Sequence, residues 1–183
     1  MKVMSFNAHT SSLPSNAHAW TRRRQLVIDI VKNYQPDIVG FQEVQQDQLA
    51  DLIDGLQGYG CHHQGWQAVD DKQELLPIFY LKEHVAISRS GAFWLNETPD
   101  IPRIDTGGGE VLRACTWAHV TCSPPAAGPG TGSTTYAIYH THLDHQKESR
   151  RETAARLIME RIRTQSAGRP AILLGDLNTR PGS

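Results

Sequence analysis

The feature that most constrains the fold is the pattern of apolar residues along the chain. Segments with the spacing of a helix alternate with short apolar runs that are typical of buried strands. Residues 20–34 repeat apolar side chains at the three- and four-residue spacing of an amphipathic helix. Short apolar runs at residues 3–6 and 37–41, which are typical of buried strands, flank this helix, and residues 49–56 repeat the helical spacing. We therefore expect the chain to open with strand, helix, strand and helix, an order typical of layered α/β proteins.

The middle of the chain changes to short β-prone runs separated by turn residues. These runs occupy residues 76–80, 85–88, 92–95, 111–121 and 135–141. Residues 123–133 are rich in Pro and Gly and predict a long loop. A third helix from about Lys147 to Thr164 and a buried strand at residues 171–174 are expected next. The expected fold is an α/β four-layer sandwich of two mixed β-sheets flanked by helices, in one domain over residues 1–183.

The composition excludes several classes of protein. Hydrophobic residues make up 39% of the chain and charged residues 20%, which is too apolar for a disordered chain. The formal net charge of -1 gives no basic field, so any binding of phosphate must be local. The three cysteines lack CxxC spacing and no apolar run reaches membrane-spanning length. We expect a cytoplasmic protein without a membrane span, monomeric at its full length.

Polar side chains follow four of the predicted strands, at the point where each strand ends. They are Asn7, Glu43, His142 and the pair Asp176 and Asn178. In layered α/β proteins such strand ends meet at one edge of the sheet, where ligands bind. Any one of them alone is typical of a turn or a helix cap, but four strand ends together supply the hard oxygen ligands that Mg²⁺ requires.

Six short blocks carry a resemblance to a known family. They are Met4-Ser-Phe-Asn7, Gly40-Phe-Gln-Glu43, the segment from Gly91 to Asp100, Arg113 with Trp117, Thr141-His-Leu-Asp144 and Gly175-Asp-Leu-Asn178. In this order they resemble the signature blocks of the endonuclease/exonuclease/phosphatase superfamily. That superfamily includes pancreatic-type deoxyribonucleases, neutral sphingomyelinases and deadenylases. The Gly-x-Phe-Trp-Leu block is similar to the branch of small bacterial metal-dependent hydrolases that are related to the deadenylase domain.

The resemblance implies roles for the residues at the strand ends. Glu43 would bind the catalytic Mg²⁺, or Mn²⁺ in its place, with Asn7 beside it. His142 would contact the scissile phosphate, and Asp176 would orient or deprotonate the attacking water. Asn178 would donate hydrogen bonds to the phosphate.

Two further positions match the family less specifically. The resemblance implies that Glu74 lines the substrate cleft and that Arg151 binds substrate, although a solvated helix face is the simpler interpretation of Arg151. The implied reaction is metal-dependent hydrolysis of a phosphodiester or phosphomonoester by in-line attack of water. The substrate would be a nucleic acid, a phospholipid headgroup or a sugar phosphate.

Two alternatives remain at this point. The run His140-Thr-His142-Leu-Asp144-His145 is also the HxHxDH zinc signature of metallo-β-lactamase-like hydrolases, and zinc favours such nitrogen-rich spacing. It leaves Asn7 and Glu43 unexplained, and no histidine follows His145. The second alternative is a catalytically silent module that retains the fold and the phosphate cleft.

The resemblance also implies a Ser-Asp-His block some tens of residues after Asn178, which the printed sequence does not contain. We therefore expect a fragment of a protein of roughly 240 to 280 residues that alone is poorly stable and nearly inactive. We also expect residues 171–174 to have a thinly covered neighbour with exposed apolar surface.

Overall fold

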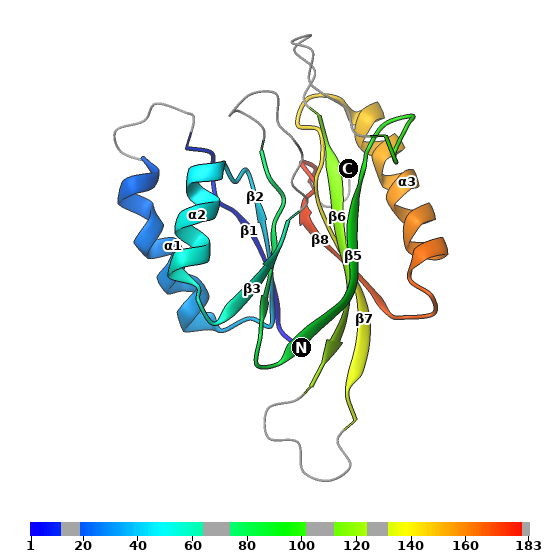
Figure 1. Cartoon of the computed structure of the whole chain (residues 1–183). Coiled ribbons are helices and arrows are strands. Elements are labelled where there is room, and N and C mark those ends of the chain that lie inside the picture. The colour runs from blue at the N-terminus through cyan, green and yellow to red at the C-terminus, as the bar shows by residue number, and fades with distance from the viewer. Residues whose placement is uncertain (12–18, 64–73, 102–111, 124–131, 181–183) are drawn as a thin grey trace.

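The described residues form two β-sheets that pack face to face (Figure 1). The structure is a computed structural model, and it describes residues 1–11, 19–63, 74–101, 112–123 and 132–180. Each sheet has four strands. The expected pair of mixed sheets is confirmed, because each sheet combines parallel and antiparallel neighbours.

The first sheet has the strand order β1-β2-β4-β3. Its strands are β1 Val3–Asn7, β2 Ile38–Gln42, β3 Tyr59–His62 and β4 Ile78–Leu81. β1 and β2 are parallel, with Asn7 opposite Gln42, and β4 is antiparallel to both of its neighbours. The parallel register places the carboxyl ends of β1 and β2 side by side.

The second sheet has the order β5-β6-β7-β8. Its strands are β5 Val85–Trp94, β6 Ala114–Cys122, β7 Thr134–His142 and β8 Ala171–Asp176. β5, β6 and β7 are antiparallel in turn, whereas β7 and β8 are parallel with His142 opposite Asp176. The last residues of β7 and β8 therefore lie next to each other at one edge.

Helices cover the outer face of each sheet (Figure 1). They are α1 Trp20–Tyr34, α2 Gln46–Gly55 and α3 Glu148–Gln165. Val31 of α1 and Leu52 of α2 share a buried cluster with Phe41 of the first sheet. Ile158 of α3 packs with Tyr139 of the second sheet. The four layers of the predicted sandwich are therefore present, and no described helix is long and apolar enough to cross a membrane.

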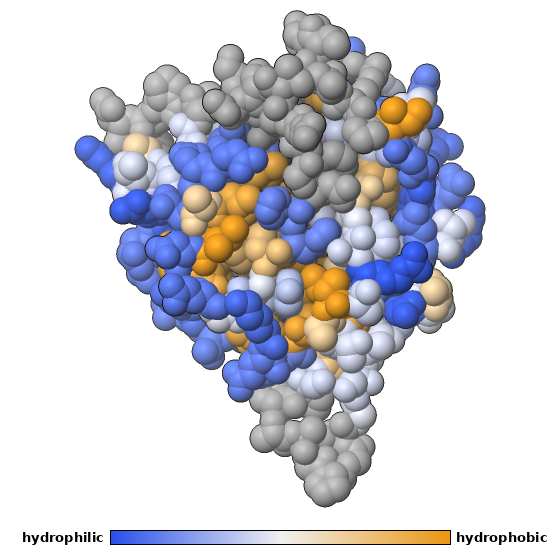
Figure 2. All heavy atoms as spheres, viewed as in Figure 1, coloured by the Kyte–Doolittle hydropathy of each residue, from blue (hydrophilic) through white to orange (hydrophobic). Residues whose placement is uncertain are grey.

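A third apolar cluster lies between the two sheets. Ile38 of the first sheet packs there with Ile138 and Leu174 of the second, and all three are buried. A Cβ at Gly40 would lie 2.6 Å from both His140 and Leu174, so only glycine allows this close approach. In the space-filling view, apolar residues are visible at the centre and hydrophilic residues cover both flanks (Figure 2).

The structure corrects two of the predicted strands. The runs at 85–88 and 92–95 are one strand, β5, with a bulge between Ile87 and Arg89 that interrupts its register with β6. β3 has no counterpart among the predictions. Most of the predicted Pro- and Gly-rich loop, residues 124–131, lies outside the described residues.

β1 and β8 are edge strands in the described sheets, because each pairs with a single neighbour. Leu173 on β8 and Val3 on β1 are each 39% exposed. Apolar surface is therefore exposed on both of these edge strands.

Candidate active site

Six polar side chains from both sheets gather at one edge of the sandwich. We call them the edge cluster: Asn7, Glu43, Glu74, Arg113, His142 and Asp176. Asn7, His142 and Asp176 are the last residues of their strands, and Glu43 directly follows β2. Antiparallel pairing with β7 brings the start of β6, and hence Arg113, to the same edge.

The amide of Asn7 joins the two sheets. Its Nδ2 donates to Glu43 Oε1 at 2.8 Å and to Asp176 Oδ2 at 3.2 Å. Two carboxylates therefore converge on one amide group. Because Glu43 follows the first sheet and Asp176 ends the second, this contact depends on how the sheets pack.

The backbone around Glu43 and Asn7 holds this geometry. Glu43 has a φ of 58°, a left-handed conformation that is uncommon outside glycine and is often found at functional sites. The backbone N–H of Thr10 donates to Glu43 Oε2 at 3.3 Å, and that of His9 donates to Asn7 Oδ1 at 2.9 Å. Buried Gln48 fixes the same loop, since its Nε2 donates to the His9 carbonyl at 3.1 Å.

His142 lies between two carboxylates and is buried. Its Nε2 is 3.9 Å from Asp176 Oδ2, and its Nδ1 is 3.6 Å from Glu74 Oε2. Nδ1 makes no hydrogen bond to any described residue. Both ring nitrogens therefore face carboxylate oxygens at more than hydrogen-bond distance.

Arg113 pairs with Glu74 and extends the charged network. Its Nη1 donates to Glu74 Oε2 at 3.3 Å, and the arginine side chain is only 11% exposed. Burial raises the pKa of Glu74, but His142 and Arg113 outweigh burial and hold that pKa below its ordinary value. Sequence reasoning assigned Arg113 no role in the site. Its occurrence in one of the six blocks, near the start of the predicted strand at residues 111–121, was the only signal.

Asp176 is held in its ionised form. Burial raises its pKa, but hydrogen bonds from Asn178 and Asn7 and the charges of His142 and Arg113 lower the pKa below the ordinary value. The Asn178 backbone N–H donates to Asp176 Oδ1 at 2.9 Å. The lowered pKa makes this carboxylate an acceptor at neutral pH.

The side chains of the two remaining predicted residues make their hydrogen bonds outside this cluster. Asn178 has a φ of 49°, and its Nδ2 donates to the Leu143 carbonyl at 2.9 Å. Arg151 on α3 donates from Nη1 to the Asp144 carbonyl at 3.2 Å. The structure therefore brings Asn7, Glu43, Glu74, His142 and Asp176 together directly, with Asn178 beside them and Arg151 on the neighbouring helix.

The histidines of the HxHxDH run lie in different environments. His140 Nε2 is 2.7 Å from Gln42 Nε2, and burial lowers the pKa of His140 to about 3, so this imidazole is neutral. His145 Nδ1 lies 3.4 Å from Arg113 Nη2. In the part of the chain that the structure describes, no three His, Cys, Asp or Glu side chains are placed to hold a metal ion. The zinc alternative therefore has no geometric support.

A cleft of about 490 Å³ opens beside Asn7 and Asp176, between β1 and β8. Its other lining residues include Ser5, Gln42, Asn178 and Arg180. Most of the lining side chains are polar, so Asn7 and Asp176 of the edge cluster are accessible to water and to a polar ligand.

A two-sheet α/β sandwich with carboxylates, an amide and an imidazole at one edge is the arrangement that the family resemblance implies. The chain belongs to the Endonuclease/Exonuclease/phosphatase family, whose sequence profile matches residues 4–183. The expected superfamily is thereby confirmed.

Three relatives show how far the similarity extends. The mannosyl-6-phosphatase of Bacteroides thetaiotaomicron is 30% identical, with a TM-score of 0.84 over 100% of this chain and 67% of its own. An endonuclease/exonuclease/phosphatase family protein of the same species is 31% identical, with a TM-score of 0.82 over 97% of this chain and 63% of its own. An uncharacterised protein of Acanthamoeba polyphaga mimivirus is 24% identical over 193 residues, covering 98% of this chain and 67% of its own. The chain thus spans between 63% and 67% of the length of these relatives.

Proposed function

We propose that this protein hydrolyses a phosphate ester by in-line attack of water, with a divalent metal ion and without a covalent intermediate. The observation that carries the proposal is the Asn7 amide, which brings the carboxylates of Glu43 and Asp176 to one point of the edge cluster. The 30% identical phosphatase from Bacteroides supports a phosphomonoester as the substrate. We treat residues 1–183 as one catalytic domain.

The chemistry of the donor set fits Mg²⁺. This ion prefers oxygen ligands, uses one or two carboxylates and keeps several waters. Glu43, with the Asn7 amide beside it, would hold the ion, and Mn²⁺ suits the same donors. When bound, the ion supplies positive charge that stabilises the phosphoryl group in the transition state.

Asp176 is the residue best suited to position the attacking water. Asn7 and Asn178 donate to its two oxygens, which fixes the orientation of the carboxylate. Its lowered pKa keeps it ionised, so it accepts a hydrogen bond from water and orients the water for attack. Deprotonation of the water by the same carboxylate is the second role that the family resemblance implies. Holding water and phosphate in line contributes much of the rate enhancement expected of such a site.

His142 and its neighbours supply donors for the phosphate. Nε2 of His142 points to the side of Asp176, and an imidazole N–H there donates to a non-bridging phosphate oxygen. Glu74 faces the other ring nitrogen at 3.6 Å, so the ring lies between two carboxylates that fix its orientation. We propose that Asn178 and Arg151 add further donors to the substrate, as the family resemblance implies.

The test is a screen for Mg²⁺-dependent turnover of phosphomonoesters, phosphodiesters and short oligonucleotides. Glu43→Gln should lower both the rate and the affinity for Mg²⁺, the rate by of order 10²-fold, because it removes a carboxylate charge and keeps the size of the side chain. Glu83→Gln makes the same change in an exposed turn between β4 and β5 and is the matched control. Unchanged turnover in Glu43→Gln would refute the metal assignment. Absence of any metal-dependent turnover in the full-length protein would favour the silent binding module.

A further inference from the structure

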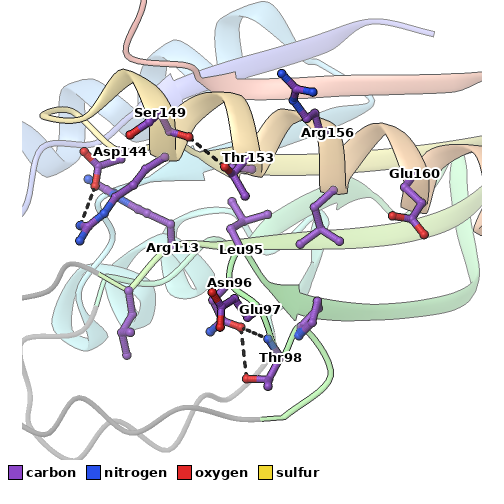
Figure 3. A pocket seen from close by; sticks show the side chains of 15 residues that line it. Leu95, Asn96, Glu97, Thr98, Arg113, Asp144, Ser149, Thr153, Arg156 and Glu160 are labelled. Atoms are coloured by element: carbon purple, nitrogen blue, oxygen red, sulfur yellow. Dashed lines mark hydrogen bonds and ion pairs between the residues drawn. The ribbon is translucent and has the colours of Figure 1, made fainter.

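A groove separate from the 490 Å³ cleft lies between α3 and the turn formed by residues 95–99 (Figure 3). Its volume is about 800 Å³, within the range of small-molecule sites. In the close-up, Ser149, Thr153 and Glu160 extend from α3 on one side, and Asn96 and Thr98 lie on the turn opposite. Of the edge cluster, Arg113 alone lines this groove.

The groove leads to the edge cluster through Arg113. This arginine lines the groove, donates to Glu74, and also lines a small cavity that His142 and Glu74 share. A phosphate held at His142 would therefore have the remainder of its molecule close to the entrance of the groove. The groove is positioned to receive the part of the substrate that carries the ester oxygen.

Both walls of the groove are tied in place. At the end of the turn, Arg161 of α3 pairs with Asp100 at 2.7 Å. On the opposite side Asp144, whose side chain is 7% exposed, accepts from the Lys147 backbone at 2.7 Å and pairs with Arg150 at 3.3 Å. A groove with fixed walls is largely preformed, which lowers the entropic cost of binding.

The residues that line the groove distinguish among the three candidate substrates, which are a nucleic acid, a phospholipid headgroup and a sugar phosphate. Its charged residues balance, since the lining includes three arginines (Arg113, Arg150 and Arg156) and three acids (Glu97, Asp144 and Glu160). A nucleic-acid strand needs a positive track for its phosphates and aromatic platforms for its bases, yet no described lining residue is aromatic. The acids and arginines also make the groove too polar for an acyl chain.

The polar and apolar groups that line the groove match a compact ligand with many hydroxyl groups. Carboxylates accept hydrogen bonds from hydroxyl groups, and arginines donate to their oxygens. Asn96, Ser149 and Thr153 add neutral polar groups, while Leu95 and Leu157 supply apolar surface. A sugar ring presents the same mixture of hydroxyl and C–H groups.

We propose that this groove binds the sugar of a sugar phosphate whose phosphate is hydrolysed at the edge cluster. The inference rests on the proposed function and narrows its substrate to a phosphorylated sugar. The groove residues contact the sugar and determine specificity, and they take no part in the chemical step.

The test blocks the groove with a bulky side chain. It then compares the KM for a sugar phosphate with the inhibition constant of inorganic phosphate. Thr153 is exposed on α3 and lines the groove, so Thr153→Trp should be tolerated by the fold and block the sugar. We expect the KM for mannose 6-phosphate and glucose 6-phosphate to rise by about 10-fold or more. The inhibition constant of inorganic phosphate, which occupies only the edge cluster, should stay within about twofold. Ala155→Trp places the same ring on an exposed part of α3 outside the groove and should change neither constant.

Several outcomes would overturn the proposal. An unchanged KM in Thr153→Trp would show that the sugar does not occupy the groove. An equal rise in both constants would show a general distortion of the site. Preferential turnover of oligonucleotides that falls in Thr153→Trp would assign the groove to nucleic acid.

A binding measurement separates this proposal from the proposed function. Methyl α-mannopyranoside carries no phosphate and needs no catalysis, so its binding to the wild-type protein can be followed by NMR shifts of Asn96 and Thr153. Shifts that are lost in Thr153→Trp would support the sugar site even if no phosphoester were hydrolysed. Absence of shifts at high millimolar sugar would overturn it even if phosphoesters were hydrolysed.

Discussion

Gly175 offers a sharp test of the geometry that positions Asp176. Its φ is +146°, a conformation that residues with a side chain rarely adopt. A Cβ at this position would lie 1.9 Å from the backbone oxygen of Thr141, its partner on β7. Since real Cβ contacts are essentially never below 3.0 Å, Gly175→Ala must move the backbone of one strand.

The expected cost has two parts. A side chain at this φ costs about 1–3 kcal/mol of backbone strain, and overpacking against a neighbouring strand costs a further ~1–3 kcal/mol. The free energy of unfolding should therefore fall by roughly 2–6 kcal/mol, a large share of the ~5–15 kcal/mol of a typical domain. The shift needed to relieve the contact is about 1 Å, and a displacement of that size at the adjacent Asp176 should lower turnover of the folded protein by of order 10²-fold.

Urea denaturation gives the change in stability, and the initial rate of phosphoester hydrolysis, corrected for the folded fraction, gives the change in activity. Gly58→Ala is the control, because a Cβ at Gly58 would meet no atom within 4 Å. If Gly175→Ala loses less than about 1 kcal/mol and keeps its turnover, the described contact between β7 and β8 is wrong.

Three further predictions concern the edge cluster. Asp176→Asn should lower kcat by about 10²–10⁴-fold with little change in KM, because the general base is lost and the shape is kept; a change confined to KM would contradict its role toward water. His145→Ala should leave kcat within about threefold, and elemental analysis should find no stoichiometric zinc in the purified protein; a large loss together with bound zinc would revive the zinc alternative. His142 and Arg113 lower the pKa of Glu74 from its ordinary 4.5, so the stability that this carboxylate contributes is complete above that pH and is lost as the pH falls through the lowered pKa. Urea midpoints between pH 3 and 6 should therefore decrease less steeply in Glu74→Gln than in the wild type, and parallel curves would exclude this contribution.

The sequence predicts the elements whose side-chain period is clear. The helix over residues 20–34 has the predicted bounds, and the predicted strand at 171–174 extends to Asp176. β3 escapes prediction because it has four residues and its buried position is Gly60, whose missing Cβ leaves room for the ring of Tyr80. An apolar pattern cannot reveal a strand that packs through the absence of a side chain.

The residues of the site also divide into those that the sequence predicts and those that it does not. Asn7, Glu43, His142 and Asp176 could be predicted because each stands at a strand end within a recognisable block. Arg113 stands at a strand start, where a charged residue gives no signal of its own. Arg113 pairs with Glu74, which lies 39 residues earlier in the sequence. This pairing depends on how the two sheets pack. Register within a sheet can be inferred from patterns, whereas contacts between sheets need the three-dimensional arrangement.

The position of β1 and β8 as edge strands has a consequence for how activity is lost. Asn7 and Asp176 end these strands, and each strand is hydrogen-bonded along one side only in the described sheets. Segments with few such bonds open at lower free energy than the centre of a protein, so β8 should exchange its amide hydrogens before β6 does. Opening of β8 separates Asp176 from Asn7 while the apolar clusters under the helices stay intact. Heating should therefore abolish hydrolysis several degrees before circular dichroism records the loss of the fold, and the loss should reverse on cooling.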